Sequence, residues 1–277
     1  MFRPSILCSA ILLSTIASAS TEYKAELKAH AFIPAKTYVA APNDAPSDLQ
    51  MSGKFTNNIR NDQAESVEGI SNGRNTGVFL PFKGQPIQGH SGIKHMDDGT
   101  HWILTDNGAG SKANSPDFML YLNQYDIDFK SNEFKHLKTV FLHDPYKKVP
   151  CRLQNEATKE RYLTGADFDP ESFQFADGYL WIGDEFGPYL IQATADGKIV
   201  NIFETQVDGK ITRSPDHYEK VTPAVPNATL DFEVKRSKGF EGMASSKDGS
   251  KLYALLEGTL YDPSLKNYEN SDSKEYL

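Results

Sequence analysis

The sequence predicts an all-β protein, a β-propeller made of four-stranded antiparallel blades. Short β-prone runs, such as residues 139–142 and 179–182, end at Asp, Asn, Gly or Pro, as strands joined by turns do. No long stretch has the 3.6-residue apolar period of a helix, although residues 155–162 could form one helical turn. The third observation is an internal repeat, which distinguishes a propeller from other all-β folds.

The repeat consists of three segments that align with one another. They are residues 91–108, 171–187 and 241–258, and each has a short strand, an Asp-Gly pair and a second, apolar strand. The pairs are Asp98-Gly99, Asp177-Gly178 and Asp248-Gly249. Asp-Gly suits a hairpin turn because glycine accepts positive φ without steric cost.

Two further strands are expected after each of the first two hairpins, so each unit forms a four-stranded meander. The units cover residues 89–144 and 164–208, close to the ~40–50 residues of a propeller blade. The third unit has only two clear strands, and a ring needs about four to eight blades. We therefore expect an N-terminal fragment of about two and a half blades. A complete β-sandwich is the alternative, since its strands need not repeat in fours.

The chain before the first blade is expected to add strands. Residues 23–39 and 76–82 look like strands separated by a polar loop, and residues 24–32 could complete the last blade only if the missing half of the propeller exists. Residues 209–226, with three prolines, are expected to form an irregular connection.

The first residues predict export to the periplasm or the outside of the cell. Arg3 precedes a short apolar run, and Ala17-Ser18-Ala19 fits signal cleavage, so residues 1–19 are a predicted signal peptide and 20–277 one domain, incomplete at its C-terminus. Cleavage leaves Cys151 as the sole cysteine, which excludes an internal disulfide. The net charge of −8 argues against nucleic acid, and no later segment predicts a membrane span. The sequence predicts no oligomeric state.

Acidic residues recur where the first two strands of the units begin and end. The second unit opens with Asp169 and Glu171, and the third with Glu241. Asp184 and Glu185 end the second strand of unit two. Asp106 and Asn107 occupy the matching place in unit one. Carboxylates that converge in this way repel one another unless a cation lies among them, and oxygen ligands favour Ca²⁺ or Mg²⁺ over zinc.

We therefore expect Asp169, Glu171 and Glu241 to hold a divalent metal, Ca²⁺ in preference. Asp184 and Glu185 are candidate catalytic residues beside it, and His217, in the irregular connection, is a further candidate acid or base. The alternative is that these carboxylates are solvated or cap backbone amides beside turns.

A basic stretch precedes the acidic opening of the second unit. Residues 147–161 carry a net charge of +3 from two arginines and three lysines against two glutamates. Arg152, Lys159 and Arg161 are expected to hold the anionic part of a substrate, because Arg forms forked hydrogen bonds to phosphate oxygens. The alternative is a solvated loop of mixed charge. The sequence contains neither a G-x-S-x-G nucleophile elbow nor a Walker loop.

Several of these segments together resemble a known family. YLTGADFDPES at residues 162–172, followed by LWIGDEFGPYL at 180–190, resembles the phytase-like family described as having esterase-like activity. Residues 239–258 and 89–108 are similar to its neighbouring blocks. The resemblance, over residues 86–258, implies an exported, metal-dependent hydrolase of small-molecule esters or phosphate esters, carried on a propeller. A non-catalytic propeller that binds a structural ion is the other function that the residues allow.

Overall fold

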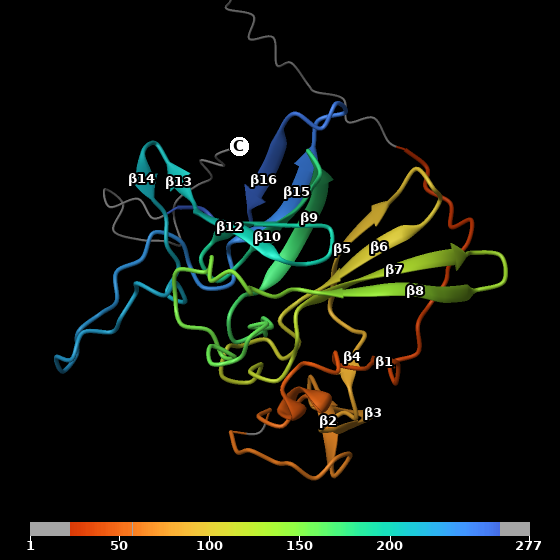
Figure 1. Cartoon of the computed structure of the whole chain (residues 1–277), viewed down its shortest axis with the longest axis horizontal. Coiled ribbons are helices and arrows are strands. Elements are labelled where there is room, and N and C mark those ends of the chain that lie inside the picture. Colours follow the sequence, from red (N-terminus) through yellow and green to blue (C-terminus); the bar gives the residue numbers. More distant parts are fainter. Residues whose placement is uncertain (1–22, 57, 261–277) are drawn as a thin grey trace, which may run out of the picture.

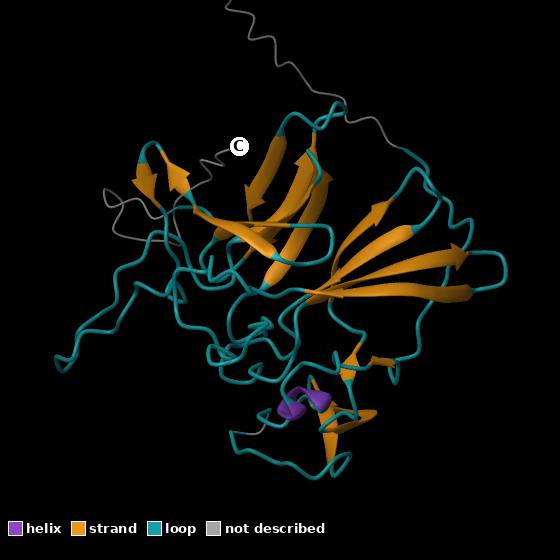
Figure 2. Cartoon of the chain, in the orientation of Figure 1, coloured by secondary structure: helices purple, strands orange, loops and turns teal. Residues whose placement is uncertain are grey.

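The computed structural model describes residues 23–56 and 58–260 of the chain. The predicted signal peptide, residues 1–19, and the polar tail from residue 261 lie outside the described residues. The described part is all-β, as predicted: its one helix is a 3-10 turn, η1 (Ser47–Gln50), and the remainder is strand and loop (Figure 2). None of its helical segments has the length and apolar character needed to cross a bilayer.

Two four-stranded antiparallel sheets dominate the molecule (Figure 1). The first contains β5 (His90–His95), β6 (His101–Thr105), β7 (Tyr121–Asp128) and β8 (Glu133–Phe141), in that order. The second contains β9 (Pro170–Ala176), β10 (Tyr179–Asp184), β11 (Tyr189–Ala193) and β12 (Ile199–Glu204), also in order. The third unit contributes the hairpin of β15 (Phe240–Ser245) and β16 (Leu252–Leu256). Consecutive strands in each sheet fit propeller blades, whereas a Greek-key sandwich would mix strands from distant parts of the chain.

Three short antiparallel pairs complete the described strands. They are β1 (Tyr38–Val39) with β4 (Gln85–Pro86), β2 (Val67–Ser71) with β3 (Arg74–Leu80), and β13 (Gln206–Val207) with β14 (Lys210–Ile211). The strand expected at 76–82 is confirmed as the greater part of β3.

Two local predictions are wrong. Residues 23–37 form no strand, and Tyr23 and Leu27 are 86% and 83% exposed, because no sheet edge among the described residues pairs with this segment. Residues 155–162 form successive turns in place of a helical turn. There the Glu156 carboxylate accepts a hydrogen bond from the backbone N–H of Leu153 at 2.9 Å, which holds the loop in its own fold.

The Asp-Gly turns use two geometries. Asp177 and Gly178 both have positive φ, 50° and 76°, so they form the two-residue turn that the sequence predicts. In the turn of the first unit only the glycine has positive φ, and the Asp98 side chain accepts a hydrogen bond from the N–H of Thr100 at 2.9 Å. The third unit repeats this arrangement at Asp248. Glycine sets the direction of the chain, and aspartate closes the turn with its side chain.

The hydrophobic core lies between the sheets. One cluster joins side chains of the first sheet, including Leu104 and Leu122, to side chains of the second, including Phe173 and Ile182. β15 packs against β9 in the same manner. Close approach depends on Gly183, where an added Cβ would come within 2.8 Å of the Cβ of Phe240 in β15. The three units therefore stack in chain order, as blades do, and the described residues do not close a ring.

Candidate metal centre

The same irregularity occurs in the first strand of all three units. His90 pairs with Thr105 and Gly92 with Leu104, so Ser91 is an extra residue on β5. By the same test, Glu171 is the extra residue on β9 and Glu241 the extra residue on β15. Such β-bulges turn a side chain out of the strand's normal alternation. Each unit thus presents one side chain of this kind near the start of its first strand.

A second position repeats after the second strand of each unit. Asp106, Glu185 and Glu257 occupy it, and each donates its backbone N–H to the carbonyl of the residue two places before the bulge. The acceptors are Gly89, Asp169 and Gly239, at 2.9, 2.9 and 2.8 Å respectively. One backbone arrangement, repeated three times, therefore brings the bulge residue and the residue after the second strand together.

Four acidic side chains at these positions, together with Asp169, form two overlapping groups. The first carboxylate group is Asp169, Glu171 and Glu185, and the second is Glu185, Glu241 and Glu257. In each group, one oxygen from every residue lies within 4.8 Å of the others. Glu185 belongs to both groups. The structure thus places Asp169 and Glu171 with Glu185, and it places the third expected ligand, Glu241, in the neighbouring group.

Asp169 is held in place by its neighbours. Asn107, from the first unit, donates its backbone N–H to Oδ1 at 3.2 Å and its side-chain amide to Oδ2 at 2.9 Å. Behind it, Asp184 is fully buried and accepts the N–H of Asp169 at 2.8 Å and that of Gly187 at 2.7 Å. Asp184, expected as a catalytic candidate, therefore uses both oxygens to fix the backbone that carries Asp169.

Burial makes the ionised form of the first carboxylate group unfavourable. It raises the pKa of Asp169 to about 9, and the charges of Glu171 and Asp184 add to the effect. Burial also raises the pKa of Glu171 to about 7, which the Ser91 hydroxyl partly opposes, and that of Glu185 to about 7. The charges that act most strongly on Asp169 and Glu185 are those of other carboxylates. When its members are ionised, their negative charges therefore repel one another.

This donor set fits a hard divalent cation. Glu185 is 5% exposed, and burial together with the charges of Glu171 and Glu241 raises its pKa to about 7. Carboxylates brought this close repel one another unless a cation lies among them. All the available ligand atoms are oxygens, which is the preference of Ca²⁺ and Mg²⁺. The carboxylate groups could therefore hold a metal ion.

The three basic residues expected to bind substrate lie in a separate loop. Arg161 is buried and pairs with Asp144 at 3.0 Å and Glu156 at 3.2 Å, so its guanidinium is already engaged by two carboxylates. Arg152 lines a cavity of about 540 Å³ with Arg161, and Lys159 is almost fully exposed beside Glu160. None of these contacts reaches the carboxylate groups.

His217 is also occupied elsewhere. Its Nε2 lies 3.0 Å from the carboxylate of Glu204, and its Nδ1 accepts the N–H of Glu219 at 3.0 Å. Its ring is buried and stacks on Tyr218. These partners hold His217 inside the irregular connection, and none of them belongs to the carboxylate groups.

The sequence does not predict the part of Glu257 or the role of Asn107. Asn107 matches the end of the second strand in unit two, but nothing local indicates its contact with Asp169, sixty-two residues away. Glu257 lies in the repeat, and the register of β15 and β16 is what assigns it to the same position as Glu185.

The stacked four-stranded sheets, with carboxylates near the starts of their first strands and after their second strands, define an all-β protein of propeller-like blades with an acidic centre. The phytase-like family model, described as "Esterase-like activity of phytase", matches residues 85–274, more than half of the chain. The chain therefore belongs to this family.

One curated relative is described as a secreted protein. An "Uncharacterized secreted protein" of Arthroderma benhamiae is 32% identical over 95 residues, which are 30% of this chain. The match spans only 18% of that protein's length. Its description gives secretion for that relative and says nothing about a reaction.

Proposed function

We propose that this chain belongs to an exported, Ca²⁺-dependent hydrolase of small-molecule esters or phosphate esters. The observation that carries the proposal is the first carboxylate group: three acidic side chains that converge within 4.8 Å and have raised pKa values. Family membership supports hydrolysis of an ester as the reaction. Secretion of the relative supports an extracytoplasmic place of action, in the periplasm or outside the cell.

In this proposal each residue of the centre has a distinct part. Asp169, Glu171 and Glu185 would hold the ion, Asn107 orients Asp169, and Asp184 fixes the backbone beneath it. A bound Ca²⁺ would supply polarisation of the ester oxygen and activation of a water molecule. The basic loop is given no part in the reaction, because its contacts do not reach these carboxylates.

The experiment compares hydrolysis of p-nitrophenyl phosphate, p-nitrophenyl acetate and phytate by the purified protein, with EDTA and with added Ca²⁺. We expect Ca²⁺-dependent turnover of one of the three, which Glu171→Gln lowers at least ten-fold, the scale of loss seen when the surroundings of a metal are altered. Glu133→Gln, at an exposed carboxylate of β8, is the matched control and should retain activity.

The rival function is a binding propeller in which the ion is structural. Ca²⁺ that raises the melting temperature of the protein, without turnover of any of the three esters, would favour it over the hydrolase. If Ca²⁺ produced neither stabilisation nor turnover, that result would refute the cation site itself.

A further inference from the structure

Lys238 lies at the edge of the second carboxylate group. Its ammonium donates a hydrogen bond to Oε1 of Glu257, and the two form an ion pair. The charges of Glu185 and Glu241 also raise the pKa of Lys238. The ammonium is therefore bound to the second group at Glu257, and it also feels the charges of the other two members.

The backbone holds Lys238 in this place. The carbonyl of Lys238 accepts the N–H of Gly258 at 3.3 Å, and the carbonyl of Gly239 accepts the N–H of Glu257 at 2.8 Å. Lys238 and Glu257 are thus fixed beside each other by the repeated backbone arrangement. Most surface ion pairs join side chains that are free to separate, and they contribute little for that reason. Here both side chains are 39% exposed, but their starting points are fixed.

A cation at this position is particular to the third unit. Lys238 lies three residues before the bulge residue Glu241. The same position holds Gln88 in the first unit, where the amide bonds to the carbonyl of Gly108 at 3.3 Å. In the second unit it holds Phe168, which is 1% exposed and belongs to the hydrophobic core. The third unit has an exposed acidic residue at both repeated positions: Glu241 at the bulge and Glu257 after the second strand. Among the three described units, this is the one that carries the lysine.

Two divalent ions could in principle bind here and share Glu185, as the two ions of many phosphoryl-transfer sites share ligands. An ammonium that is hydrogen-bonded to Glu257 competes directly with the second ion, since both need the oxygens of Glu257. Asp169 and Glu171 belong to the first group alone and take no part in that competition.

We propose that Lys238 is a tethered cation that occupies the second carboxylate group, so that the protein binds one divalent ion, in the first group, and not two. This inference rests on the proposed function for the ion in the first group. With Lys238 in this place, the centre would use a single metal ion with a fixed ammonium beside it. The positive charge on the second group is then set by the chain and does not vary with the concentration of Ca²⁺.

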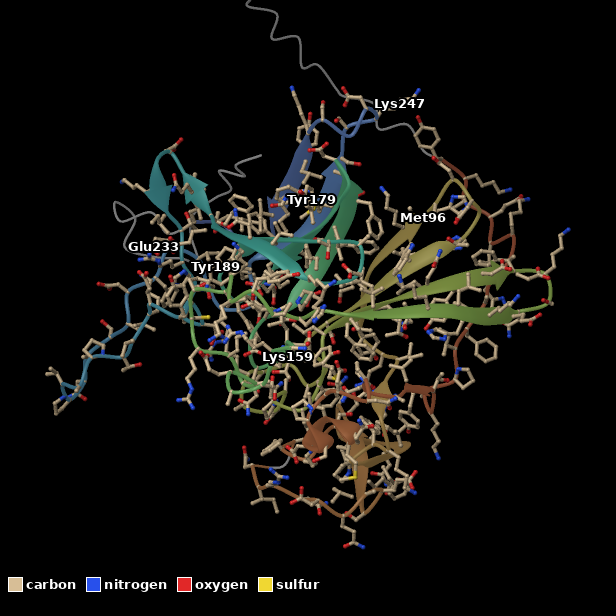
Figure 3. The ribbon with its side chains drawn as sticks, viewed as in Figure 1. Met96, Lys159, Tyr179, Tyr189, Glu233 and Lys247 are labelled. Atoms are coloured by element: carbon tan, nitrogen blue, oxygen red, sulfur yellow. The ribbon has the colours of Figure 1, made fainter. Side chains whose placement is uncertain are left out.

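The test is the number of Ca²⁺ ions bound per chain, measured by isothermal titration and by equilibrium dialysis of EDTA-stripped protein at pH 8. Lys238→Met keeps the apolar stem and removes the charge. It should bind one more Ca²⁺ per chain than the wild type. Lys238→Arg, which keeps the charge, should match the wild type. Lys247→Met removes an equal charge from the turn of the same β15–β16 hairpin (Figure 3) and should also match the wild type.

The outcomes separate this inference from the proposed function. Equal stoichiometry in the wild type and in Lys238→Met overturns the role of Lys238, as does a wild type that binds two ions. No ion in the wild type and one in Lys238→Met refutes the ion of the proposed function while supporting the tethered cation. Lys238→Gln repeats the measurement with a polar side chain, and circular dichroism of each variant checks that the sheets are intact.

Discussion

Replacing Glu185 with Gln should stabilise the ion-free protein at alkaline pH. Folding raises the pKa of Glu185 from 4.5 to about 7, and the side chain is 5% exposed, so solvent screens it little. One pKa unit corresponds to about 1.36 kcal/mol, so the ionised carboxylate destabilises the folded protein by about 3 kcal/mol. Gln carries no charge and avoids this destabilisation.

The sign of the pH dependence follows from proton binding. Between pH 4.5 and about 7 the folded state keeps a proton on Glu185 that the unfolded state has released. The free energy of unfolding therefore falls as pH rises through this window and is level above it. The advantage of Glu185→Gln should be absent near pH 4 and reach about 3 kcal/mol at pH 8.

Urea unfolding in EDTA at pH 5, 6, 7 and 8 measures the difference in unfolding free energy between Glu185→Gln and the wild type. In a second series in saturating Ca²⁺, the wild type should be the more stable of the two. The wild type gains about 4 kcal/mol when Ca²⁺ is present at a thousand times its dissociation constant. Glu185→Gln should gain far less, because it lacks the ligand common to both carboxylate groups. Glu133→Gln is the control at an exposed carboxylate. A variant that is no more stable than the wild type in EDTA at pH 8, and that gains as much from Ca²⁺, would refute the reasoning.

Three further predictions concern the centre and the packing around it. Asn107→Ala should weaken Ca²⁺ binding about 10- to 100-fold in a calorimetric titration, because Asn107 orients Asp169; unchanged affinity would contradict this role. The affinity for Ca²⁺ should rise between pH 6 and pH 9, since the ion displaces protons from carboxylates of raised pKa; a flat titration would argue against a carboxylate site. Gly183→Ala should lower the unfolding free energy by about 1–3 kcal/mol in urea, because its Cβ would meet Ser172 and Phe240; a neutral change would mean that the blades can separate freely.

The blade architecture could be predicted because its signals are local. Each four-stranded sheet pairs only neighbours in sequence, and the turns between strands contain glycines of positive φ, such as Gly99, Gly178 and Gly197. A strand at residues 24–32 was predicted as the N-terminal strand that completes the last blade of a closed propeller. A strand also needs a partner, and no local pattern shows that this segment has none among the described residues.

The acidic centre could be predicted only in part because its register is not visible in the sequence. An ungapped alignment of the first and third repeats places Glu257 opposite Asn107. The turn in the third unit is one residue longer, since β15 ends at Ser245 and β16 begins at Leu252, whereas β5 and β6 are separated by residues 96–100. The strand pairing therefore moves Glu257 into line with Asp106.

The pairing of Arg161 could not be predicted for a related reason. A run of positive charge in the sequence does not show which cations are already paired. Arg161 is buried against Asp144, seventeen residues earlier, and this contact depends on how the loop closes upon itself. Sequence spacing could suggest a basic surface but could not distinguish an anchoring arginine from a free one.

The division of the centre among three units has a consequence for the order of folding. Each sheet closes through contacts between neighbouring segments, which form quickly because little chain must be ordered. The carboxylates meet only when finished sheets come together, and at neutral pH their mutual repulsion opposes that late step. A cation in the surrounding medium would then act on the docking of the sheets and leave the formation of each sheet unaffected. Refolding should accordingly show a slow phase that Ca²⁺ accelerates, after a fast phase that Ca²⁺ does not change.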